Sequence, residues 1–197
     1  MNHNTQFKMT LISAAILIAL TSCNEQQSNP GTNGFVIELG NMKSAINDAD
    51  MYFMNEATEI NLEEIRLSEV ALERSKNPEI RILGKKLTDQ HYQSLLDLTA
   101  LASRINITIP TKLGDKENVD YEKLNHMAGE ALDREYVTMM VKEHKEAIAL
   151  FEKEAKSGTD PDIKKWAAAT LPEMHTHLDY AVACQGILPM CSDSSSH

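Results

Sequence analysis

Apolar side chains recur at intervals of three and four residues in four long segments of this 197-residue chain. That spacing places them on one face of an α-helix, because a helix has about 3.6 residues per turn. Leu, Ala, Glu, Lys, Met and Ile dominate the composition, as is typical of helices, and no segment carries a clear strand pattern. The segments are 48–75, 78–104, 130–157 and 161–184. Four amphipathic helices of this kind predict an all-α four-helix bundle.

The turns between these segments carry helix-boundary signals. Asn77 precedes Pro78, and Asp160 precedes Pro161, so each pair combines an N-cap side chain with proline at the first helical position. The connection over 105–116 is irregular, and a short helix is expected over 121–127. Pro172 lies inside the last segment, where its missing amide hydrogen predicts a kink or a loosened turn.

The N-terminus has the pattern of a bacterial lipoprotein signal. A polar stretch with one basic residue, Lys8, precedes the apolar run 9–20. A helix of that length reaches roughly 18 Å, well short of a hydrocarbon core of about 30 Å. The run ends in Leu20-Thr21-Ser22-Cys23, which resembles a lipobox. We therefore predict that residues 1–22 are removed and that Cys23 carries lipid; the alternative is an ordinary cleaved signal with a chance cysteine.

Lipidation at Cys23 would place the protein in the cell envelope, held on a membrane by its acyl chains. Asn24 follows the cysteine, and by analogy with enteric bacteria this favours the outer membrane, facing the periplasm. Residues 23–47 are polar and aperiodic, which predicts a lipidated tether. The predicted bundle domain spans 48–186, and 187–197 form a C-terminal strap and tail.

The other two cysteines, Cys184 and Cys191, form an even pair in a compartment that favours oxidation. We predict a disulfide between them; the alternative is a pair of thiols that could bind a metal. The formal net charge is −10 and no basic patch is visible, so the sequence argues against nucleic acid as a partner. It identifies no protein partner.

Each apolar stripe carries one strongly polar residue: Glu64, His91, His144 and His177. Counting from the turns at roughly 1.5 Å per residue places all four within some 10 Å of the middle of the bundle. We expect them to be mutual neighbours, because a carboxylate buried alone is costly. Two arrangements satisfy this: a site for one transition metal ion (Zn, Fe, Mn or Cu), or a metal-free network in which Glu64 pairs with protonated histidine.

Several ordered motifs occur together between roughly 49 and 183: Glu64-Ile65-Arg66-Leu67, Ser75-Lys76-Asn77-Pro78-Glu79-Ile80-Arg81, Asp89-Gln90-His91, Asp133-Arg134-Glu135-Tyr136, His144, and Thr170-Leu171-Pro172 with His177. This ordered set resembles the uncharacterised bacterial family catalogued as DUF4142, whose members are often described as exported or outer-membrane proteins. The resemblance covers roughly 49–183. It implies a ferritin-like bundle with a left-handed crossover between the second and third long helices, and no established activity. Gln90 stands where the family usually has an aspartate, and Leu132 where it usually has phenylalanine.

Ferritin-type di-iron centres use Glu-x-x-His on two helices, and no inward face here has that spacing. Nor does the sequence show a nucleophile–base pair or a phosphate-binding loop. The leading interpretation is therefore a non-enzymatic, envelope-anchored helical bundle that binds a ligand or partner, with a metal ion in its core as a candidate cofactor. The alternatives are a metal-dependent enzyme of oxidative stress or metal oxidation, and a purely structural envelope protein.

Overall fold

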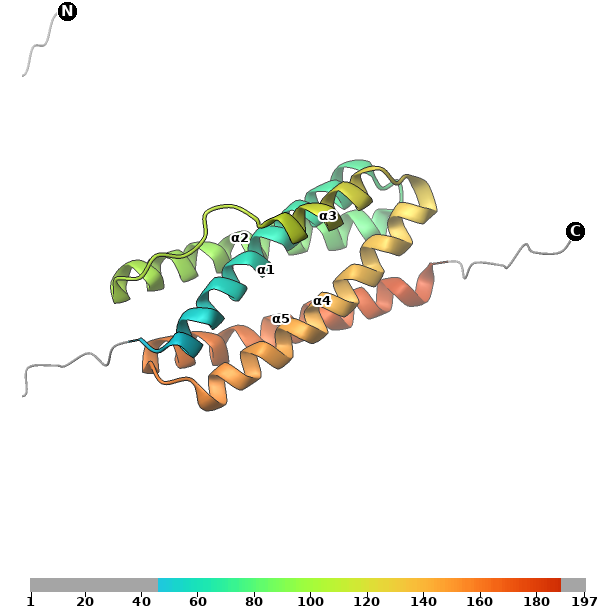
Figure 1. Ribbon diagram of the computed structural model, residues 1–197. Coiled ribbons are helices and arrows are strands. Elements are labelled where there is room, and N and C mark those ends of the chain that lie inside the picture. The colour runs from blue at the N-terminus through green and yellow to red at the C-terminus, as the bar shows by residue number, and fades with distance from the viewer. Residues whose placement is uncertain (1–45, 189–197) are drawn as a thin grey trace, which may run out of the picture. The chain divides into compact units, whose positions relative to one another are not determined.

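The computed structural model describes residues 46–188, apart from the side chains of 115–117. It contains five helices in this range: α1 (Asp48–Arg74), α2 (Pro78–Ile105), α3 (Asp115–Asn125), α4 (Gly129–Ser157) and α5 (Pro161–Ile187) (Figure 1). The predicted all-helical bundle is confirmed. None of the helices described is long and apolar enough to cross a membrane. The predicted signal peptide, Cys23, nearly all of the tether and Cys191 lie outside the described residues.

The helix boundaries follow the predicted capping signals closely. Asn77 accepts a hydrogen bond from the backbone amide of Glu79, and Asp160 accepts from the amides of Asp162 and Ile163. These side chains satisfy amides that the first turn of a helix cannot pair internally.

Two expectations about helix ends were wrong. The short helix α3 begins at residue 115, six residues before the predicted start at 121. Helix α5 ends at Ile187, three residues beyond the predicted end at 184, and it includes Pro172. Proline removes one hydrogen bond, to the carbonyl of Ala168, and that residue is exposed to solvent, which can hydrate the carbonyl.

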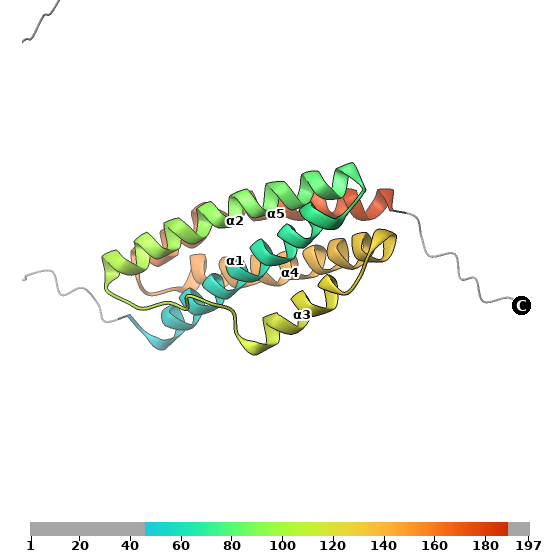
Figure 2. The same cartoon turned by 90° about the horizontal axis from the view of Figure 1, so that it is seen from above.

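The long connection over 106–128 runs back along the bundle. The α1–α2 pair and the α4–α5 pair are each hairpins. Helix α2 starts where α1 ends, and Arg74, the last residue of α1, donates a 2.7 Å hydrogen bond to the carbonyl of Met127, just before α4. Helices α2 and α4 therefore start at the same end of the bundle, and the connection between them, which includes α3, must cross its length (Figures 1 and 2). A crossover at this place is what the family resemblance implied.

The apolar core is divided into two clusters by a polar layer. One cluster contains Leu67, Leu83 and Tyr136, and the other contains Phe53 and Phe151. Each long helix contributes to both clusters, and its polar residue lies between the two contributions: Glu64 in α1, His91 in α2, His144 in α4 and His177 in α5. The polar layer therefore lies in the middle of the bundle, as the sequence predicted.

Helices α1 and α2 approach each other closely at Gly84. A methyl group added there would lie 2.9 Å from the backbone oxygen of Ser68 and 3.0 Å from the backbone nitrogen of Leu72. We expect Gly84→Ala to lower the free energy of unfolding by about 1–2 kcal/mol, because the strain of separating two backbones exceeds the gain of about 1 kcal/mol in helix propensity. Urea denaturation measures this. Gly186→Ala is the matched control, because nothing lies within 4 Å of its added methyl group and it should be neutral or stabilising. A Gly84→Ala variant as stable as the wild type would contradict the close approach.

A cluster of acidic side chains joins the start of α1 to the α4–α5 turn. The buried Asp50 accepts hydrogen bonds from the amides of Thr159 (2.9 Å) and Asp160 (2.8 Å). Burial, followed by the negative charge of Asp50, raises the pKa of Glu154 to about 7. The folded state therefore holds this carboxyl protonated at a pH where the unfolded chain has already ionised it.

This shift predicts a pH-dependent effect of Glu154→Gln. The stabilising contribution of Glu154 is complete below its unfolded pKa near 4.5 and is lost as pH rises to about 7. The glutamine variant should therefore be more stable than the wild type above pH 7, by about 1 kcal/mol once solvent screening is allowed for, and the difference should shrink toward pH 5. Thermal denaturation at pH 5 and pH 8 tests this, with Glu152→Gln, an exposed neighbour, as control. A difference that does not change with pH would rule out the explanation.

Candidate metal centre

The structure brings together the four polar residues that the sequence singled out. Glu64 is 1% exposed, and His91, His144 and His177 are also buried. The carboxylate of Glu64 lies 3.1 Å from Nε2 of His91 and 3.3 Å from Nδ1 of His144. The three imidazole rings pack against one another in edge-to-face or tilted arrangements, with centroids 5.1, 5.3 and 5.5 Å apart. Each helix of the bundle thus supplies one member of a single buried cluster.

Oxygen atoms outside the cluster orient two of these rings. Nδ1 of His144 donates to the backbone carbonyl of Met140 at 3.0 Å. Nδ1 of His91 donates to the side-chain oxygen of Asn61 at 3.1 Å. Asn61 presents that oxygen because its amide nitrogen donates to the carbonyl of Ala57. In both rings the proton resides on Nδ1, so a neutral ring has a bare lone pair on Nε2.

His177 repeats this arrangement with its nitrogens exchanged. Its Nε2 donates to the side-chain oxygen of Gln90 at 2.8 Å, which leaves the lone pair on Nδ1. Among the described residues, Nε2 of His144 and Nδ1 of His177 have no hydrogen-bond partner. Nε2 of His91 lies 3.1 Å from Oε2 of Glu64, so a proton or a cation is needed between these two atoms. Metal-binding histidines characteristically use one nitrogen for the ion and donate the other to an oxygen.

The spacing suits a shared ligand. Each of the three histidines offers a nitrogen within 4.8 Å of the other two. Metal–nitrogen bonds are about 2.0–2.1 Å long, so small rotations of the side chains would let one ion contact all three. Glu64, in contact with two of the rings, can supply a fourth, anionic ligand.

Burial and neighbouring charges act in opposite directions on the pKa values of the cluster. Burial opposes ionisation of Glu64, but His144 and His91 outweigh it and lower its pKa. Burial in turn lowers the pKa of His144, and burial together with the other two histidines lowers that of His177 to about 2. The ionised Glu64 needs a positive neighbour, whereas His144 and His177 resist protonation. A metal ion would satisfy both requirements.

Sequence reasoning missed the residues that orient the rings. Asn61 lies one helical turn before Glu64 on the inward face of α1, and this spacing could have indicated it. Gln90 was noted only as a departure from the family pattern, yet its oxygen holds His177 as a carboxylate in that position could. Met54, Met140 and Met174, by contrast, are buried in the core.

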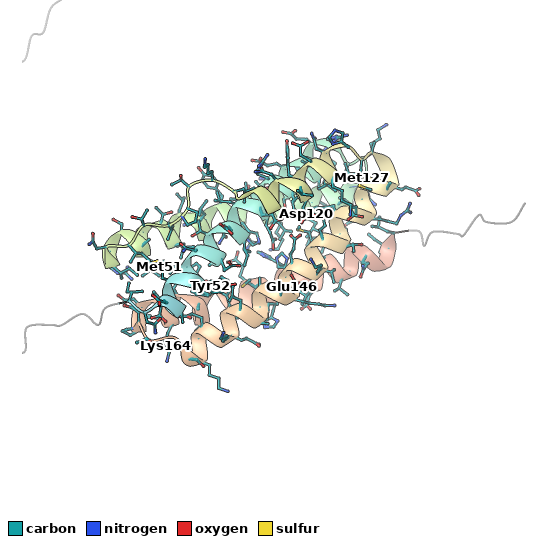
Figure 3. The ribbon with its side chains drawn as sticks, viewed as in Figure 1. Met51, Tyr52, Asp120, Met127, Glu146 and Lys164 are labelled. Carbon is teal, nitrogen blue, oxygen red and sulfur yellow. The ribbon has the colours of Figure 1, made fainter. Side chains whose placement is uncertain are left out.

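A cavity of about 270 Å³ lies beside the cluster, between α1 and α4, and Glu64 is part of its wall. Tyr52, Asp120 and Glu146, labelled in Figure 3, come from α1, α3 and α4 and line this cavity. On the other side of the cluster, where Gln90 and His177 lie, the free volume is only about 10 Å³. The cluster is therefore approached through a wide cavity on one side and is tightly packed on the other.

The structure does not support the predicted disulfide. Among the described residues no disulfide is found, and Cys184 lies buried in the core. Burial, followed by the charge of Glu79, raises the pKa of its thiol to about 11. Because Cys191 lies outside the described residues, its pairing with Cys184 stays a prediction.

Fold and cluster together define a class: an all-helical bundle with a buried centre of three histidines and one glutamate. The chain belongs to the family described as domain of unknown function (DUF4142), whose sequence profile matches residues 40–184. No curated protein is significantly similar to it.

Two solved structures have a similar fold. A DUF305 fragment from Deinococcus radiodurans is 13% identical, with a TM-score of 0.64 over 72% of this chain and 97% of that one. A DUF305 protein from Streptomyces coelicolor, described as a candidate secreted protein, is 13% identical, with a TM-score of 0.59 over 70% of this chain and 92% of that one. At these identities the likeness concerns the fold alone.

Proposed function

We propose that this protein is an envelope lipoprotein whose bundle binds one transition metal ion through His91, His144, His177 and Glu64. The observation that carries the proposal is the set of three bare imidazole nitrogens, each opposite an N–H that is hydrogen-bonded to an oxygen. A metal ion would occupy the space that these lone pairs share.

The unpaired atoms favour a metal over a purely structural network. A buried polar atom without a hydrogen-bond partner costs about 1–3 kcal/mol, and five such atoms converge here. In a metal-free network a proton between Glu64 and Nε2 of His91, which are 3.1 Å apart, would satisfy that pair but leave Nε2 of His144 and Nδ1 of His177 without a partner. A single ion would satisfy the three nitrogens and the carboxylate together.

The ligand set restricts the choice of metal. Imidazole nitrogen suits zinc, copper and iron, whereas manganese, magnesium and calcium prefer oxygen. Four protein ligands would also complete a tetrahedral site, as in structural zinc centres, whereas catalytic sites leave one position open. The arrangement therefore supports a metal-binding protein more than a metal-dependent enzyme.

The envelope location rests on the lipobox at Cys23. In this proposal the acyl chains hold the protein on a membrane, the outer membrane in the leading interpretation, and the tether lets the bundle face the periplasm. The bundle itself needs no membrane contact to bind an ion.

Metal analysis of the full chain, purified without a histidine tag or chelator, tests the binding. The wild type should carry about one equivalent of metal, or take up one when zinc, iron, manganese or copper is added. His177→Ala should lose it, with circular dichroism used to check that the bundle is retained. His175→Ala is the matched control, because this exposed histidine lies on the same helix. A metal-free wild type that ignores all four added metals would leave the structural network as the explanation.

A further inference from the structure

The cavity between α1 and α4 connects the surface of the bundle with the histidine cluster. Tyr52 and Glu146, which line it, are both exposed to solvent (Figure 3). Glu64, which also lines it, is 1% exposed and contacts His91 and His144. The cavity volume of about 270 Å³ leaves room for a metal ion with several bound water molecules, since one water needs only about 10–15 Å³. Solvent therefore reaches one of the four proposed metal ligands from this side.

The opposite side of the cluster is closed to an ion of that size. Gln90 and His177 lie there, joined by a hydrogen bond of 2.8 Å, and the free volume is about 10 Å³. That volume is about what a single water molecule needs. A hydrated ion could not pass on this side without displacing the side chains that orient the cluster. Access to the imidazoles is therefore much easier from the cavity.

The walls of the cavity are strongly acidic. Seven carboxyl groups from α1, α3 and α4 line it against one basic side chain, Lys142. Burial, followed by the charge of Glu64, raises the pKa of Glu143 to about 9, so this carboxyl is neutral at neutral pH and the negative charge comes from the other six. A concave surface lined by charges of one sign raises the association rate of opposite charges by about 10- to 1,000-fold. This attraction acts through the summed charge and requires no ion bound in the cavity itself.

We propose that this cavity is the route by which a divalent metal ion enters the imidazole centre, with Glu64 as the first ligand that it meets. The inference rests on the proposed function, because it concerns the same ion and the same four ligands. Oε2 of Glu64 lies 3.1 Å from Nε2 of His91, so an ion that reaches this carboxylate from the cavity is already beside the first imidazole. The other cavity carboxylates then set the rate of capture, whereas Glu64 and the histidines set how long the ion is held.

Stopped-flow mixing of the metal-free full chain with Zn²⁺, with a fluorescent indicator of free zinc, tests the route. A variant with three cavity carboxylates neutralised, Glu56→Gln with Asp120→Asn and Glu146→Gln, should capture zinc at least about tenfold more slowly in about 0.01 M salt. The difference should shrink in about 0.15 M salt, where the Debye length falls from about 30 Å to about 8 Å. The dissociation rate and the one equivalent of bound zinc should be unchanged.

The matched control combines Glu69→Gln, Glu152→Gln and Asp179→Asn. It removes the same charge from exposed positions on α1, α4 and α5 that do not line the cavity, and should slow capture by no more than about twofold. Glu146→Lys provides a second test at a single position. Because Glu146 is exposed, this variant should keep the fold, and the added positive charge should slow capture more than Glu146→Gln does.

Three results would overturn the route and leave the imidazole centre standing, because bound zinc is measured separately. Equal capture rates in the wild type and the cavity variant would place the entry elsewhere. Equal slowing in the cavity variant and its control would indicate an effect of net charge alone. Faster release of zinc from the cavity variant would make the carboxylates ligands rather than a route. A wild type that takes up no zinc would also overturn the route, and the imidazole centre with it if iron, manganese and copper were ignored as well.

Discussion

Stripping the metal from the wild-type protein should lower its free energy of unfolding by about 4 kcal/mol, if the free metal concentration beforehand was about a thousand times the Kd. The reason is that an ion that binds only the folded state stabilises it by mass action. The proposed ligands come from α1, α2, α4 and α5, which meet only in the folded bundle. This is the largest effect on stability that we expect of any treatment. Urea denaturation with and without chelator measures it.

His144→Ala should abolish this metal response. The ring is completely buried and is hydrogen-bonded to the carbonyl of Met140, so its loss removes a proposed ligand and leaves a cavity in the core. The variant should be less stable than the wild type, and added metal should not restore it. His175→Ala should keep the full response. Equal responses of His144→Ala and the wild type would place the metal elsewhere.

The metal response should also persist below the ordinary titration range of histidine. Burial lowers the pKa of His144 and, with the neighbouring histidines, lowers that of His177 to about 2, so protons compete with the metal for these two rings less than they do for exposed imidazoles. In the metal-free protein the same pKa shifts make stability depend on pH. The free energy of unfolding should be highest above pH 6.5, the pKa of histidine in the unfolded chain, and should fall as the pH decreases below that value. Denaturation curves at pH 5.5 and 7.5, with and without zinc, should show both effects.

Cys23→Ser should transfer the protein from the membrane fraction to the soluble fraction. Each buried methylene of an acyl chain contributes about 0.8 kcal/mol, and a single chain binds only marginally, whereas the several chains of a bacterial lipoprotein anchor stably. Without the cysteine no lipid can be attached. Cell fractionation and intact mass together measure the outcome.

Cys191→Ser is the control for this change, because it makes the same replacement at a cysteine that the lipobox does not contain. It should leave the protein in the membrane fraction with its lipid mass intact. A Cys23→Ser protein that stays on the membrane with an unchanged lipid mass would show that the lipobox interpretation is wrong.

Much of the fold could be predicted because its determinants are local. Asn77 with Pro78, and Asp160 with Pro161, set helix boundaries within a few residues of sequence, and the structure shows both caps. The sequence did not indicate where α3 begins, because its N-cap residue, Gly114, has no side chain that could cap the helix. Its course is set instead by contacts with α1, such as that of Arg66 with Asn118.

The sequence by itself determined that four helices would each bury one strongly polar residue at mid-height, because periodicity fixes the face and counting along the helix fixes the height. Only the tertiary structure decided which nitrogen of each histidine is bare and where the acidic cavity lies. Those features depend on how each helix is rotated and on which segment lies over it. The side-chain oxygen of Asn61 orients His91, and that of Gln90 orients His177, in each case from a neighbouring helix. Asp120 lines the cavity because the connection that contains α3 passes over α1. Such contacts join residues 30 to 87 positions apart, a distance over which no local pattern extends.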